Sequence, residues 1–340
     1  MVTSILFGIA VVIVYYLLPR KYRKILLTIA SIGFYLILDW KMVLVLLMTG
    51  IWIWWCGLYI KPTKKGLVLE LLPIVLVLIF FKYNHFFVTE AAKLLNGIGL
   101  ASSTHTLSIL MPLGISYYIF KSVSYLGDVY KGKIEAETSP LNILLYISFF
   151  PVITSGPISG YDRFKKALDD GMTYSEYNIQ LGSYLIIKGV FMKVVIANRL
   201  ANYVDAIFKD PGAYPGLAMW LGVFFFTIQL YCDFAGYSSI AIGITQLLGL
   251  HLQENFNRPY LAAGIREFWE RWHISLSSWL RDYIYFPLGG SRCSKTRTGI
   301  NLLIVFIVCG LWHGQGLHYL IWGLYHGILS IISRHWKTER

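Results

Sequence analysis

Charged side chains are scarce in this sequence. Asp, Glu, Lys and Arg make up 14% of the 340 residues, whereas hydrophobic residues make up 56% and aromatic residues 16%. Because soluble proteins average about 25% charged residues, this chain has too few charges to cover a water-exposed surface. The composition therefore excludes a soluble globular protein and indicates that most of the chain is solvated by a lipid bilayer.

The sequence also lacks the motifs of several enzyme classes. It contains no Gly-rich phosphate loop, dinucleotide fingerprint or GxSxG nucleophile elbow, so nucleotide and serine-triad chemistry are unsupported. No internal repeat of the kind found in many transporters is visible. The four cysteines lie far apart and indicate neither a zinc site nor a disulfide framework: Cys56, Cys232, Cys293 and Cys309.

The net charge of +12 does not indicate nucleic-acid binding. The basic residues flank apolar segments instead of forming a soluble basic face, and anionic lipid head groups are their ordinary partners. A basic cluster at residues 20–24 and another at residues 61–65 fall in alternate loops, while the loops around Trp40 and from Tyr83 to Thr104 are nearly neutral. The first apolar stretch lacks a basic segment before it and a small-residue cleavage site after it, which predicts a retained first helix. The positive-inside rule places the N-terminus outside the cell, and we expect a multi-pass protein of the plasma membrane.

Apolar stretches recur along nearly the whole chain. Several approach the ~20 residues that a membrane-spanning helix needs. They predict an all-α polytopic membrane protein with about eleven transmembrane or re-entrant helices in one domain, residues 1–340. Peripheral helices are expected in residues 1–105 and the catalytic core in residues 106–340. The stretches are 5–18, 25–39, 42–60, 66–81, 107–126, 140–156, 181–197, 216–232, 234–250, 299–312 and 317–333.

Polar residues interrupt the apolar runs from Leu110 onward, which predicts the working interior there, because a bilayer tolerates buried polar groups only where protein or water covers them. Asp233 stands between two apolar runs, either as a solvated boundary carboxylate or as a group that orients an interior Arg or His. The segment Arg266–Gly290 is too charged to cross lipid and predicts an interfacial or re-entrant helix. Its Arg271 is spaced to pair with Glu267 and Ser275.

Two histidines are candidates for chemistry. His273 lies within the interfacial segment, where a lone His is more often structural than catalytic. His313 ends an apolar run in LWHGQG, and an intramembrane ionisable group is a functional-site hypothesis by default. A buried imidazole stays neutral and accepts a proton from an attacking hydroxyl, as an acyl-transfer base must do; the alternative is a packing histidine.

A metal site is not predicted. His318 and His326 share a helical face with Trp322, but the sequence has no HExxH motif and no Asp or Glu near these histidines.

Five ordered motifs carry a family resemblance. FWERWHISLSSWLRDYIYFPLGGSR, followed after an apolar helix by LWHG, closely resembles the pattern of the membrane-bound O-acyltransferase superfamily, with the bacterial alginate O-acetylase type nearest. PLGISYYIFKSVSYLGDVY, SFFPVITSGPI and DFAGYSSIAIG resemble matching stretches of that family, so the similarity runs roughly from Met111 to Gly327.

The resemblance implies a ring of helices around a central tunnel, with His313 catalytic and His273 a second important residue. The other residues expected to line or support the tunnel are Arg271, Trp272, Ser275, Asp282, Trp312 and Asp233. No tightly bound cofactor is implied. A cytoplasmic thioester, acetyl-CoA or an acyl-carrier protein, would donate an acyl group to an envelope polysaccharide, assisted by an extracytoplasmic or membrane-tethered transferase or a small helper protein.

Two features leave alternatives open. Alginate-type members continue for several more membrane segments, whereas this chain ends at Arg340, as a compact variant or without a C-terminal extension. TSGPI at Thr154 is similar to the branch that D-alanylates teichoic acid, whereas PLGGSR at Pro287 is similar to the acetylase branch. The acyl group is therefore acetyl or D-alanyl. An alternative from another functional class is a transporter or lipid flippase, in which His313 and Asp233 would be polar residues that line the transport path.

Overall fold

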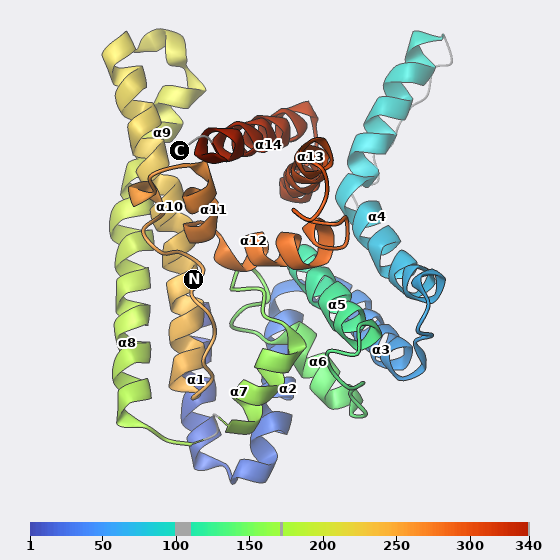
Figure 1. Cartoon of the computed structure of the whole chain (residues 1–340). Helices are drawn as coiled ribbons and strands as arrows, with labels where there is room; N and C mark the ends of the chain where they lie inside the picture. Colours follow the sequence, from blue (N-terminus) through green and yellow to red (C-terminus); the bar gives the residue numbers. More distant parts are fainter. Residues whose placement is uncertain (99–109, 171–172, 339–340) are drawn as a thin grey trace. The chain divides into compact units, whose positions relative to one another are not determined.

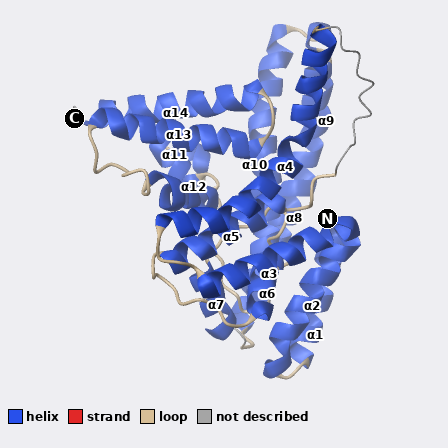
Figure 2. Ribbon diagram, turned by 90° about the vertical axis from the view of Figure 1, so that its right-hand side faces the viewer, coloured by secondary structure: helices blue, strands red, loops and turns tan. Residues whose placement is uncertain are grey.

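The computed structural model describes residues 1–98, 110–170 and 173–338. Within these ranges the secondary structure is helical and contains no strand, which confirms the predicted all-α class (Figures 1 and 2). Five helical segments are long and apolar enough to cross a membrane: Arg20–Tyr59, Lys64–Gly97, Glu176–Lys209, Gly216–Leu247 and Lys295–His313. The count of about eleven segments is not confirmed, and the central tunnel stays a prediction.

The chain divides into two compact units. Unit 1 comprises Met1–Gly33 and Phe149–Asn257, and unit 2 comprises Phe34–Ser148 and Arg258–Arg340. Unit 1 holds α1 (Val2–Leu17), most of α2 (Arg20–Asp39), α7 (Tyr161–Asp170), α8 (Glu176–Val190), α9 (Asn198–Lys209) and α10 (Gly216–Leu247). Unit 2 holds α3 (Val43–Tyr59), α4 (Lys64–Gly97), α5 (Ile115–Tyr130), α6 (Pro140–Ser148), α11 (Ile265–Arg271), α12 (Ile274–Leu280), α13 (Lys295–His313) and α14 (Leu317–Thr338). The single domain predicted for residues 1–340, with its division near residue 105, stays a prediction.

In unit 1, α8 and α10 pack with their backbones in contact (Figure 1). A methyl group added to Gly189 would lie 2.5 Å from the Gly236 carbonyl oxygen, and one added to Gly182 would lie 2.8 Å from that of Gly243. Small residues allow this close approach, which is how helices associate within lipid.

Asp233 lies inside α10, which is a single helix where the sequence predicted two apolar segments. Its carboxylate accepts a hydrogen bond from Lys193, which belongs to a π-helical segment, Phe191–Ala197, between α8 and α9. The ion pair supplies the carboxylate with a partner, so the helix need not end at the charge.

In unit 2, helix α4 is longer than the sequence predicted. The apolar run was expected to stop at residue 81 and to be followed by a loop from Tyr83 to Thr104, but the helix continues to Gly97. Residues 99–104 lie outside the described residues. The polar side chains after residue 81 are compatible with a helix, and Lys82 and Tyr83 find hydrogen-bond acceptors within the fold.

Candidate functional site

His273 occupies a break between two short helices. The predicted single interfacial helix is wrong at this point, because α11 ends at Arg271 and α12 begins at Ile274. Between them, Trp272 is extended and His273 takes a left-handed conformation with φ 44° and ψ 52°. Residues other than glycine rarely adopt that region, although His is enriched among those that do. The strained position marks a functional candidate.

The His273 side chain is almost fully buried, at 1% exposure. Burial, and then the nearby His313, lower its pKa from 6.5 to about 3. The imidazole is therefore neutral at physiological pH. Its ring lies 5.9 Å from the ring of Trp312, measured between centroids.

The end of α13 carries the second histidine. The helix stops at His313, and the next residue, Gly314, has fully extended backbone. A methyl group on Gly314 would lie 2.1 Å from the Tyr319 ring, so only glycine lets the chain turn closely into α14. Further along this hairpin, a methyl group on Gly310 would lie 2.3 Å from the Tyr319 carbonyl oxygen. The two helix backbones are therefore in contact, which fixes the helix end that carries His313.

The His313 ring lies between two indoles. Its centroid is 4.9 Å from that of Trp312 and 5.0 Å from that of Trp322, both edge to face. The residue has surface exposed in the structure, because it is the last position of α13 and precedes Gly314. The structure thus brings His273 and His313 to the same indole, that of Trp312, and leaves His313 with exposed surface.

Helix α5 packs against the indole of Trp312. Phe120 stacks on Trp279 with 3.8 Å between ring centroids, and it also packs on Trp312 at 5.6 Å. The Trp279 Nε1–H donates to the Phe120 carbonyl oxygen at 3.0 Å and to Ser124 Oγ at 2.8 Å. The aromatic stack therefore links α12, α5 and the end of α13.

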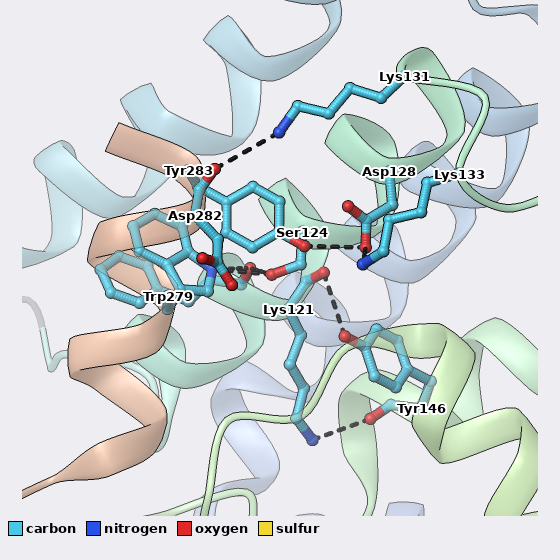
Figure 3. A network of polar contacts seen from close by, with 10 residues as sticks. Lys121, Ser124, Asp128, Lys131, Lys133, Tyr146, Trp279, Asp282 and Tyr283 are labelled. Atoms are coloured by element: carbon cyan, nitrogen blue, oxygen red, sulfur yellow. Dashed lines mark hydrogen bonds and ion pairs between the residues drawn. The ribbon is translucent and has the colours of Figure 1, made fainter. Parts of the chain in front are cut away.

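A buried polar network continues from Trp279 (Figure 3). Tyr283 Oη donates to the Asp128 carboxylate at 2.8 Å, and Lys133 donates to the same oxygen at 3.1 Å. Asp128 is only 2% exposed, so these bonds compensate for the loss of its hydration. Burial and then Asp128 raise the pKa of Tyr283, which keeps its hydroxyl a donor. The network holds the segment after α12 against the end of α5.

Four other residues predicted for the site lie between the end of α11 and the segment after α12. Arg271 donates to Glu267 at 2.5 Å, as predicted, whereas Ser275 lies across the helix break from Arg271 and is buried. The Trp272 ring stacks on Phe268 with 5.6 Å between centroids. Asp282 accepts a hydrogen bond from the neighbouring Arg281 at 2.9 Å and is half-exposed.

Asp233 belongs to unit 1, where it pairs with Lys193. The histidines belong to unit 2. Roles for Asp233 and for the four residues around α11 and α12 stay predictions.

Several residues at the site were not predicted. From α4, Lys82 and Tyr83 reach the last carbonyl groups of α13. The signal in the sequence is a lysine inside an apolar run, FFKYNHFF.

On α14, Trp322 contacts both His313 and His326, and the His326 ring lies 5.1 Å from that of Trp269. Among the described residues, Trp312 Nε1, Trp269 Nε1 and His326 Nδ1 are buried atoms without a hydrogen-bond partner. The two indole nitrogens are donors, and unsatisfied buried polar atoms of this kind are rare in folded proteins.

Within the part of the chain that is described, no group of three or more His, Cys, Asp and Glu side chains is placed to hold a metal ion. The arrangement brings together an exposed imidazole, a second imidazole that is buried and neutral, and indole N–H donors beside them.

Comparison with known proteins identifies the family. The model of the membrane-bound O-acyltransferase family, MBOAT, matches residues 25–338. The chain belongs to the MBOAT family. This is a family of membrane proteins, and the match covers α11 to α14 and all the site residues described above.

Named relatives fall into three groups. This MBOAT chain is 39% identical to an alginate O-acetylase of Pseudomonas aeruginosa, with 94% of this chain and 62% of the relative covered. It is 34% identical to a peptidoglycan O-acetyltransferase of Helicobacter pylori, with 92% and 64% covered. It is 37% identical to a teichoic acid D-alanyltransferase of Bacillus subtilis, with 64% and 57% covered. The chain thus spans about 62% of the length of the alginate O-acetylase that it matches.

Proposed function

We propose that this MBOAT protein is an O-acyltransferase of the cell envelope, which transfers an acetyl group from a thioester to a polysaccharide hydroxyl with His313 as the base. The observation that carries the proposal is the accessible imidazole of His313 at the end of α13, held between Trp312 and Trp322. Similarity to two O-acetyltransferases that act on envelope polymers supports the choice of substrate.

The proposed reaction is a direct acyl transfer. A neutral His313 nitrogen accepts the proton of the attacking hydroxyl while the hydroxyl oxygen forms a bond to the acyl carbon. The carbon–sulfur bond then breaks, and the protonated imidazole returns its proton to the departing thiolate. The Trp312 Nε1–H, which has no partner among the described residues, is a donor for the negative charge that develops on the carbonyl oxygen.

His273 has a different proposed role. Its buried imidazole is neutral, and its ring centroid lies 5.9 Å from that of Trp312. We assign it to holding that indole and the break between α11 and α12, and His313 to the proton transfer. Its replacement is therefore expected to affect the geometry of the site more than the pH dependence of transfer.

The direct test replaces His313 with Ala. In membranes supplied with radiolabelled acetyl-CoA, His313→Ala should lower ester formation at least about 100-fold, the contribution typical of a positioned base. The matched control is His318→Ala, because His318 is an exposed histidine at the start of α14. Both variants should reach the membrane in equal amounts. Activity retained in His313→Ala refutes the proposed mechanism.

The second candidate is D-alanyl transfer to teichoic acid. The similarity to a teichoic acid D-alanyltransferase and the TSGPI motif at Thr154 favour it. Mild base releases the esterified group from cell envelopes, so envelopes with and without the gene should differ in acetate under the first proposal. A difference in D-alanine establishes the second instead.

The proposal includes location and partners. We place the protein in the plasma membrane as a multi-pass protein, with the thioester donor, acetyl-CoA or an acyl-carrier protein, on the cytoplasmic side. An extracytoplasmic or membrane-tethered transferase or a small helper protein would assist the transfer to the polysaccharide. Support comes from the five apolar helices and from the family. Proteolysis of exposed loops in sealed vesicles of known orientation tests the sidedness.

A further inference from the structure

The last carbonyl groups of α13 are held by another helix. A helix leaves its final carbonyls without partners inside the helix, and α13 ends at His313. Two adjacent residues of α4 reach this end: Tyr83 Oη donates to the Leu311 carbonyl oxygen at 2.6 Å, and Lys82 Nζ donates to the Trp312 carbonyl oxygen. The carbonyl that Lys82 holds belongs to the peptide bond that joins Trp312 to His313.

The contact is reciprocal. The side-chain amide of Gln315, just beyond His313, donates to the backbone carbonyl of Lys82. The Lys82 ammonium group also lies 5.7 Å from the centroid of the Trp312 ring. Three hydrogen bonds therefore connect one turn of α4 to the residues on both sides of His313.

The charge of Lys82 is unusual for its place. The residue is 7% exposed, lies in a helix long and apolar enough to span the membrane, and has no carboxylate partner among the described residues. A buried ammonium group is unfavourable unless it is hydrogen-bonded, and here it faces the negative end of a helix dipole. An apolar residue would suit lipid better, so the lysine indicates a function.

We propose that Lys82 and Tyr83 are positioning residues for His313. This inference rests on the proposed role of His313 as the base. Holding the carbonyls of Leu311 and Trp312 fixes the peptide plane that precedes His313, and so fixes the direction in which the imidazole leaves the helix. A catalytic group displaced by 1 Å loses up to about 100-fold in rate, so a loosened helix end lowers turnover even when substrate still binds.

The kinetic test uses variants of α4. Lys82→Met keeps the length of the side chain and removes its donor and charge, Lys82→Arg restores both, and Tyr83→Phe removes a single oxygen. With acetyl-CoA as donor, Lys82→Met should lower kcat at least about tenfold while the KM for acetyl-CoA stays within about twofold. Tyr83→Phe should lower kcat about threefold, as expected for one hydrogen bond. Lys82→Arg should recover most of the kcat lost in Lys82→Met.

The control variant is Lys93→Met. Lys93 lies on the same helix, is 67% exposed and pairs with Glu90 at 2.8 Å, so its removal should leave kcat unchanged. If Lys82→Met does not accumulate in the membrane, Tyr83→Phe decides the question, because it deletes one atom from the same contact. An unchanged kcat in the variants that do accumulate overturns the proposal.

A second measurement does not depend on activity. Diethyl pyrocarbonate modifies neutral imidazoles, and mass spectrometry gives the modification rate at each histidine. Lys82→Met should change the rate at His313 at least about threefold and leave that at His251, an exposed histidine of unit 1, unchanged. Equal rates at His313 overturn the positioning role. If His313→Ala remains active, the base assignment fails, and the labelling alone still decides whether Lys82 positions this imidazole.

Discussion

The buried His273 makes the stability of the protein depend on pH. Its pKa is about 3 in the folded protein, chiefly because of burial, and 6.5 when the side chain is solvated. Between these values the unfolded state binds a proton that the folded state does not, so the free energy of unfolding falls as the pH is lowered through 6.5. From pH 7 to pH 5 this one group is expected to remove about 2 kcal/mol of stability.

The variant His273→Asn isolates this contribution. Asn does not titrate and tolerates the left-handed backbone at this position. Purified protein in detergent micelles, unfolded with a denaturing detergent and followed by tryptophan fluorescence, gives an apparent free energy of unfolding at each pH. The wild-type protein should lose about 2 kcal/mol more than the variant between pH 7 and pH 5. Equal losses refute the assignment of a buried, neutral imidazole.

Two substitutions test the packing around the site. Gly314→Ala places a methyl group 2.1 Å from the Tyr319 ring, so the ring must move and ester formation should fall at least about tenfold with the protein still inserted; unchanged activity contradicts the close turn. Trp279→Phe keeps the stack on Phe120 but removes the donor to its carbonyl and to Ser124, and should lower the free energy of unfolding by about 2 kcal/mol, measured by detergent unfolding.

The helical class was predictable because it follows from composition. A chain with 14% charged residues and long apolar runs has few ways to satisfy its backbone hydrogen bonds other than helices in lipid. Boundaries were less predictable. A charge was taken to end an apolar run, yet Lys82 and Asp233 both lie inside continuous helices, α4 and α10. Each charge is satisfied by a partner far along the chain, which local sequence does not show.

Only some residues of the candidate site were predictable, and their arrangement was not. The motif around His313 identified the histidine as a candidate, and the structure places it at a helix end. The proximity of His273 to Trp312 depends on the interruption of the helix between α11 and α12, and no Gly or Pro in the sequence indicates that interruption. Trp322 and His326 were seen only as a helical face, because the contact between Trp322 and His313 requires the turn at Gly314.

The backbone contact between α8 and α10 has a consequence for how the protein is assembled in the membrane. The contacts pair Gly182 with Gly243 and Gly189 with Gly236, and only a short connection separates α9 from α10. In lipid such contacts, and not the hydrophobic effect, drive association of helices that have already inserted. This hairpin is therefore expected to close as soon as Leu247 has left the ribosome and entered the bilayer, before α13 and α14 have left the ribosome.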